Sequence, residues 1–196
     1  MAENKIKYGI SKCAYAVATI ASNGSATYGD VVELPGAVSI SLASQGERSV
    51  FYADNVEYYV MNINSGYEGD LTLARIPDDF CIDVLGEVED SKNVLIEVKD
   101  KEPIHFALMF QFEGDQNATR HVLYNCTASR PDINGNTKEE NIAPETEAIT
   151  ITAKSIYNAV IDDHIVKGKS KEDTDSTVYN AWFTSVHQPV ASTGTP

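Results

Sequence analysis

Apolar and polar residues alternate in short runs along most of the chain, and this pattern predicts a mainly β protein. Over residues 36–43, Val38, Ile40 and Leu42 fall on one side of a strand, while Ser39 and Ser41 fall on the other. Turn-forming residues recur about every ten positions, a spacing that is typical of a sandwich or a barrel.

The strongest predicted hairpin lies between residues 104 and 126. Its first strand has an unbroken apolar face, and after a polar turn at residues 113–117 the second strand returns with the same alternation. We therefore expect the hydrophobic core here. If Phe112 pairs with Thr119, His105 and His121 lie far apart along the hairpin. The apolar positions are Ile104, Phe106, Leu108, Phe110 and Phe112 in the first strand, and Val122, Tyr124 and Cys126 in the second.

Residues 51–86 predict a strand, a turn, a second strand and a short helix. A β-rich run at residues 58–63 is followed by Asn64-Ser65-Gly66, whose residues tolerate positive φ, so we expect the chain to reverse there. Residues 45–54, just before this run, are expected to form a long connection. Pro77 ends the second strand, and Asp78 or Asp79 is expected to cap a helix that stops at Gly86.

The C-terminal region fits two interpretations. Val178, Trp182 and Val186 would share one side of a helix, and they would equally share one face of a strand. Thr174 or Asp175 can cap a helix, which favours the helical alternative. The predicted fold is two packed antiparallel sheets, a sandwich or half-barrel, with one short helix near residues 77–85 and a possible C-terminal helix near 175–186. We expect a single domain over residues 1–187 and a flexible tail over 188–196.

The charge balance restricts the possible partners. The 196 residues include 29 acidic and 15 basic side chains, which leaves a net charge of −14. Such a surface repels nucleic acid and disfavours specific DNA binding. The chain shows neither a signal region at its N-terminus nor an apolar run that could span a membrane. We therefore expect no membrane association, and synthesis and folding in a reducing cytoplasm.

Three features resemble chemical motifs, and none of them is complete. Gly168-Lys169-Ser170 matches the end of a phosphate-binding loop, but Asp163 stands where that loop needs its first glycine, so we expect a solvated turn. Asp132, Asn134 and Asn136 have the spacing of calcium ligands, but Thr137 replaces the required glycine, so a turn is again the better interpretation. We expect this turn to lie in a polar loop over residues 130–143.

The cysteines and histidines do not form a recognisable site either. Cys13, Cys81 and Cys126 are widely spaced and form no CxxC pair, and Cys126 is expected to be a small core residue. The four histidines show no ligand spacing and no triad pattern. We expect no enzymatic activity, no catalytic residue, no metal site and no cofactor.

Several short pieces of the chain resemble the major tail protein, the tail tube subunit, of long non-contractile-tailed bacteriophages (siphophages). The central pieces are FYADN at residues 51–55, GYEGDL at 66–71, LARIPDDF at 73–80 and VLG at 84–86. Others follow in the order expected for that family: LPGAVSISL at 34–42, HFALMF at 105–110, VLYNC at 122–126, SRP at 129–131 and WFTSV at 182–186. The resemblance therefore covers most of the chain.

The resemblance implies a structural virion protein of the tail, made in the host bacterial cytoplasm. Its copies would form hexameric rings that stack into a tube, through which DNA passes at ejection without specific binding. Other implied partners are a tape measure protein in the lumen and tail-terminator or tail-tip proteins at the ends. The strands around residues 36–42 and 58–73 would line the lumen, and residues 44–58 would contact the next ring. Candidate inter-subunit residues are Arg48, Phe51, Tyr52, Asp54, Tyr58, Tyr59, Glu68 and Asp70.

A second class of function stays open on the residues alone. Tyr52, Tyr58, Tyr59 and Tyr67 could form a platform on which sugar rings stack, which would make the protein an acidic β-sandwich carbohydrate-binding module. Strand tyrosines more often fill cores or subunit interfaces, and we favour that interpretation.

Overall fold

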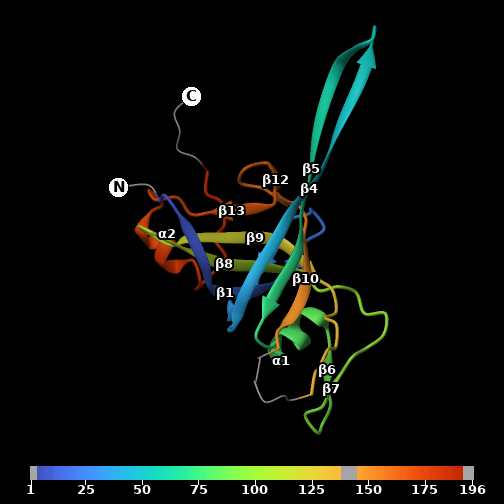
Figure 1. Cartoon of the computed structure of the whole chain (residues 1–196), viewed down its shortest axis with the longest axis vertical. Helices are drawn as coiled ribbons and strands as arrows, with labels where there is room; N and C mark the ends of the chain where they lie inside the picture. Colours follow the sequence, from blue (N-terminus) through green and yellow to red (C-terminus); the bar gives the residue numbers. More distant parts are fainter. Residues whose placement is uncertain (1–3, 138–144, 192–196) are drawn as a thin grey trace.

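The computed structural model describes residues 4–137 and 145–191, and most of their strands join one antiparallel sheet (Figure 1). The nine-stranded sheet has the order β2-β1-β8-β9-β10-β5-β4, with β3 paired to β1 and β13 paired to β9. Its strands are β1 Lys7–Ile20, β2 Ala26–Tyr28, β3 Val32–Glu33, β4 Ala37–Ala53, β5 Val56–Leu73, β8 Phe106–Gly114, β9 Thr119–Ala128, β10 Glu147–Ala153 and β13 Lys167–Lys169.

Two small hairpins accompany this sheet: β6 Val88–Glu89 with β7 Leu95–Ile96, and β11 Ile156–Asn158 with β12 Asp163–Ile165. The predicted fold class, mainly β with antiparallel sheets and a short helix, is confirmed. Among the described residues, no helix is long and apolar enough to cross a membrane.

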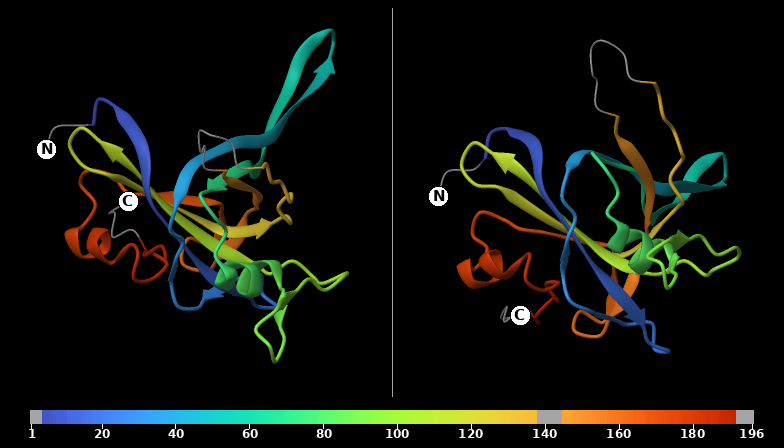
Figure 2. Two further views of the ribbon diagram at one scale, coloured as in Figure 1. Left: turned by 60° about the horizontal axis from the view of Figure 1, so that its bottom comes forward. Right: turned by 90° about the horizontal axis from the view of Figure 1, so that it is seen from below.

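One face of the sheet packs on a short helix. α1 (Asp78–Phe80) continues directly into a π-helical turn, η1 (Cys81–Leu85), as predicted for this region. Phe80 is fully buried between Tyr15 and Phe106, with ring centroids 5.1 and 5.7 Å away in edge-to-face geometry. β4, at one end of the sheet order, and β1, next to the other end, both contribute to this core, so the sheet curves around the helix (Figure 2).

The ends of this helix confirm one prediction and correct another. Gly86 ends it in the left-handed region, with φ of 75°, as predicted. The capping position, however, belongs to Pro77, and no side chain caps the helix. Asp78 and Asp79 are the first two residues of the helix, where their negative charge lies near the positive end of the helix dipole. The prediction that either aspartate is the cap was wrong.

The opposite face of the sheet packs on the C-terminal region. α2 (Ser176–Ala181) begins at Asp175, whose carboxylate accepts hydrogen bonds from the backbone N–H groups of Thr177 and Val178. The helical alternative is therefore confirmed for this stretch. Trp182 and Val186 follow α2 and are buried against the sheet, where the Trp182 indole donates to the His121 carbonyl at 3.3 Å.

The β8–β9 hairpin forms in the predicted place, with Phe112 opposite Thr119, and Phe106 and Leu108 fully buried. Ile104, expected in the first strand, lies before β8 and is only partly buried. One detail differs. The register shifts between Phe106, which is opposite Cys126, and Leu108, which is opposite Leu123, so β9 holds an extra residue there. As a result, Cys126 lies in the core with α1, as predicted, whereas Val122 and Tyr124 face the C-terminal region. The single alternation expected for β9 was wrong.

The β4–β5 hairpin corrects the largest error of the sequence interpretation. The two strands pair continuously from Ala37 opposite Leu73 to Ala53 opposite Val56. The reversal falls at Asp54 and Asn55, whose φ values of 52° and 60° form a two-residue turn of the kind that suits twisted strands. Residues 45–53 are therefore strand and not a connection, only Asp54 of that segment lies in the turn, and the chain does not reverse at residues 64–66. There, Gly66 accommodates a bulge between the two strands.

Two further predictions concern segments that are only partly described. The polar loop expected at residues 130–143 has no helix or strand over 131–137, and the rest of it lies outside the described residues. The tail expected at residues 188–196 also lies mostly outside them.

Candidate functional site

The hairpin of β4 and β5 extends far beyond the rest of the sheet (Figures 1 and 2). β10 pairs with β5 only from Leu73 to Tyr67. Between Gly66 and the tip of the hairpin, β4 and β5 pair with each other and with no other described strand. We call residues 46–64 the projecting arm.

Two glycines allow the arm to leave the sheet. Gly66 has φ of 102°, and a Cβ atom there would lie 1.9 Å from the carbonyl oxygen of Ala153, at the end of β10. A Cβ on Gly46 would lie 2.2 Å from the carbonyl oxygen of Ile63, on the opposite strand. Only glycine fits these close backbone contacts. The base of the arm is therefore fixed by backbone packing.

One face of the arm is apolar and exposed. Residues directly opposite each other in an antiparallel pair point to the same face. One face of the arm therefore carries Phe51 with its partner Tyr59, and Ser49 with its partner Met61. Val56 and Ile63, from the neighbouring pairs, lie on the same face. Phe51 is 63% exposed and Tyr59 is 59% exposed. We call Phe51, Val56, Tyr59, Met61 and Ile63 the apolar face of the arm.

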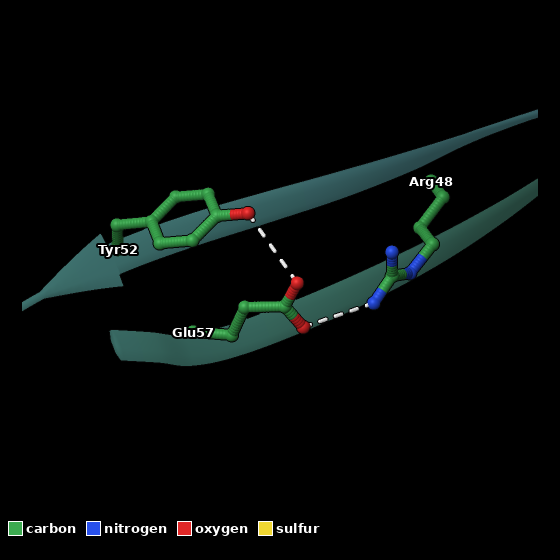
Figure 3. Close-up of polar contacts among 3 residues, drawn as sticks. All are labelled: Arg48, Tyr52 and Glu57. Carbon is green, nitrogen blue, oxygen red and sulfur yellow. Dashed lines mark hydrogen bonds and ion pairs between the residues drawn. The ribbon is translucent and has the colours of Figure 1, made fainter. Parts of the chain in front are cut away.

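The other face of the arm has a polar cluster (Figure 3). Arg48 Nη2 lies 3.0 Å from Glu57 Oε2, and the Tyr52 hydroxyl donates to Glu57 Oε1 at 3.3 Å. All three side chains are largely exposed, so solvent screens the ion pair and its contribution to folding is about 0–1 kcal/mol. The cluster orients side chains across the two strands, and it leaves the guanidinium and the phenol open to a partner.

Glu68 and Asp70 lie on a different surface. Ser41, Asp70 and Thr150 form one row across β4, β5 and β10, and Ala43, Glu68 and Thr152 form the next. The Thr150 hydroxyl donates to Asp70 Oδ1 at 2.9 Å. We call this surface, with its small side chains, hydroxyls and two carboxylates, the hydroxyl-rich face. On the other side of the same strands, Leu71 and Leu73 are buried in the core.

The structure thus divides the eight candidate residues into two groups. It brings Arg48, Phe51, Tyr52, Asp54, Tyr58 and Tyr59 together on the arm, with Asp54 in its turn, and it places Glu68 and Asp70 below the arm. The sequence interpretation missed Val56, Met61 and Ile63, because apolar residues in a strand are normally assigned to a core. The available signal was Asp54-Asn55, a good two-residue turn with β-rich runs of similar length on both sides.

The incomplete phosphate-loop motif and two of the histidines take part in the fold. Lys169 ends strand β13, and Ser170 is buried. The Ser170 hydroxyl accepts a hydrogen bond from the backbone N–H of Arg120 at 2.9 Å. The prediction of a solvated turn at residues 168–170 was therefore wrong. His105 contacts the Asn125 side chain at 2.7 Å, and His121 stacks on Phe110. Within residues 4–137 and 145–191, no group of three potential metal ligands converges.

Comparison with known proteins agrees with this arrangement. A family model described as "Phage tail tube protein" matches residues 2–108. The match covers more than half of the 196 residues, so the chain belongs to the phage tail tube protein family. It is a structural component of the virion tail and of multimeric tail tubes. No curated protein matches the chain.

Proposed function

We propose that this protein is the major tail tube subunit of a siphophage, and that its copies form hexameric rings stacked into a conduit for DNA ejection. The observation that supports this most directly is the apolar face of the arm. Five large apolar side chains stand in solvent on a two-stranded hairpin that no other described segment covers. Exposed apolar surface of this kind marks an interaction site. A neighbouring copy is the expected partner, and ring-to-ring contact is the expected role.

The edges of the sheet suggest how one ring closes. β4 is the last strand in the sheet order, so the backbone groups on its outer side have no strand partner among the described residues. β2 and β3 lie at the other end of the order, on β1. Pairing one end of the sheet with the other end on the next copy is a head-to-tail contact, which closes into a ring. Pooling strands from several copies also widens the enclosed barrel.

The hydroxyl-rich face is our candidate for the lumen wall. Its side chains are short, and Glu68 and Asp70 are its charged groups on β5. Carboxylates repel phosphates, so passing DNA would not adhere to this surface. The same lumen would hold a tape measure protein before ejection, and terminator and tail-tip proteins would close the ends of the tube. Synthesis would take place in the host cytoplasm.

Electron microscopy of the purified chain at high concentration tests this proposal. We expect rings or tubes, and we expect analytical ultracentrifugation to show a species of six subunits or multiples of six. A chain that stays monomeric at every concentration would contradict the proposal. The alternative, a carbohydrate-binding module, is favoured by the exposure of Tyr52, Tyr58 and Tyr59. A monomer that binds glycans, and loses this binding on Tyr58→Ala, would support that alternative.

A further inference from the structure

A basic and aromatic cluster extends along β13 from Tyr67, next to the base of the arm, towards the β8–β9 turn. Lys7 Nζ is 4.4 Å from the ring centroid of Phe112, and Lys167 Nζ is 4.6 Å from that of Tyr67. Lys169 pairs with His121 in the register of β13 and β9, and the His121 ring stacks on Phe110 and meets the edge of Phe112. We call Lys7, Lys167, Lys169 and the rings of Tyr67, Phe112 and His121 the basic cluster.

The three lysines of this cluster act together on the His121 side chain that lies among them. In the part of the chain that the structure describes, none of the three lysines forms an ion pair. The pKa of His121 is lowered to about 4, first by burial and then by the charges of Lys169, Lys167 and Lys7. Three exposed ammonium groups thus concentrate on one small surface of a chain whose net charge is −14.

A surface with complementary properties lies at the other end of the molecule. The segment of residues 87–102 contains β6 and β7, and Figure 1 shows it at the end of the long axis opposite the arm. It has six carboxylates and three lysines. Val94 and Ile96 are about half exposed beside them. Glu89 and Glu102 are exposed, and neither forms an ion pair with another described residue.

We propose that the basic cluster receives the acidic segment of residues 87–102 from a second copy of this chain, in the head-to-tail contact between successive rings. The proposal rests on the proposed function and specifies the partner surfaces within it. Carboxylates of the segment would meet the lysines, and its exposed valine and isoleucine would meet the aromatic rings. A second copy is favoured over DNA because the high negative charge of the whole chain repels a polyanion at longer range.

Charge exchange between two variants tests the contact. One variant has Lys167→Glu and Lys169→Glu, and the other has Glu89→Lys and Glu102→Lys. Each alone would place like charges against each other, and we expect its critical concentration for tube formation to rise by on the order of tenfold or more. In an equimolar mixture each variant offers the surface that the other lacks, so we expect tubes to form again. Circular dichroism and thermal melting verify that both variants fold.

The controls separate this inference from the proposed function. A variant with Arg75→Glu and Lys154→Glu makes the same change in net charge as the Lys167→Glu, Lys169→Glu variant, at exposed positions outside the cluster, and it should form tubes nearly as well as the unmodified chain. If the two test variants form tubes as readily as this control, the inference is overturned and the proposed function stands. If the unmodified chain forms no tubes, the proposed function itself fails. Binding of duplex DNA that depends on Lys167 and Lys169, with tube formation unchanged, would also overturn the inference.

Discussion

At the scale of single residues, burial distinguishes the side chains that stabilise the fold from those that are available for assembly. Phe110 is buried in the core, whereas Phe51 is exposed on the arm. Phe110→Ala should therefore lower the free energy of unfolding by about 3–5 kcal/mol. Phe51→Ala should change it by no more than about 0.5 kcal/mol. Urea denaturation of the two variants measures the difference, and equal losses would place Phe51 in the folding core.

Leu108 tests how tightly the same core is packed. Its side chain is fully buried among neighbours from β1, β9 and the α1–η1 helix. Leu108→Phe adds volume that a close-packed interior cannot accommodate without strain, so we expect it to destabilise the fold by about 1–3 kcal/mol. Urea denaturation measures this as well. A cost near zero would indicate a loosely packed core.

His121 gives the fold a pH dependence of known sign. Its pKa in the folded chain is about 4, and an unperturbed histidine has a pKa of about 6.5. Between these values the unfolded chain binds more protons, so stability is complete above about pH 6.5 and declines as the pH falls towards 4. We expect the urea midpoint of the unmodified chain to drop between pH 7 and 5, and His121→Gln to reduce that drop. An equally steep decline in the variant would contradict this account.

At the scale of elements, Gly66 determines how the arm joins the sheet. A side chain at this position meets the Ala153 carbonyl and also requires a left-handed φ, so Gly66→Ala should destabilise the fold by about 1–3 kcal/mol. A Cβ atom on Gly135 would meet no described atom within 4 Å, and Gly135→Ala should cost far less. Thermal melting of both variants provides the comparison. If Gly66→Ala and Gly135→Ala have the same melting temperature, the contact with β10 does not constrain the arm.

The sequence predicts some elements well because their signals are local. The β8–β9 hairpin combines apolar alternation with a polar turn. The turn lies where expected, whereas the extra residue in β9 breaks the alternation expected for that strand. The arm could not be located in this way, because Asp54-Asn55 and Asn64-Ser65-Gly66 both tolerate the positive φ that a reversal needs. Strand pairing decides between them, and pairing is a long-range property. For the same reason the sequence does not indicate that Met61 is exposed, since an apolar residue in a strand fits a core as well as a partner.

At the scale of the whole molecule, the apolar side chains fall into two populations. Those of β8, β10 and the lower part of β5 are buried in the protomer, whereas those of the arm remain in solvent. Exposed apolar residues on a hairpin this long favour aggregation unless they are covered in the working state. The arm is therefore explained best as an element that is completed by assembly.

Removing the apolar face of the arm should abolish assembly without unfolding the protomer. The variant is Phe51→Asn, Tyr59→Asn and Met61→Asn, whose side chains contact solvent in the isolated chain. We expect an unchanged circular dichroism spectrum and no tubes in the electron microscope. The matched control is Ile133→Asn, Val160→Asn and Val190→Asn, which removes three other exposed apolar side chains. It should still form tubes, because these positions lie outside the arm. Polymerisation of the arm variant at the concentration that suffices for the control would show that ring contacts form elsewhere.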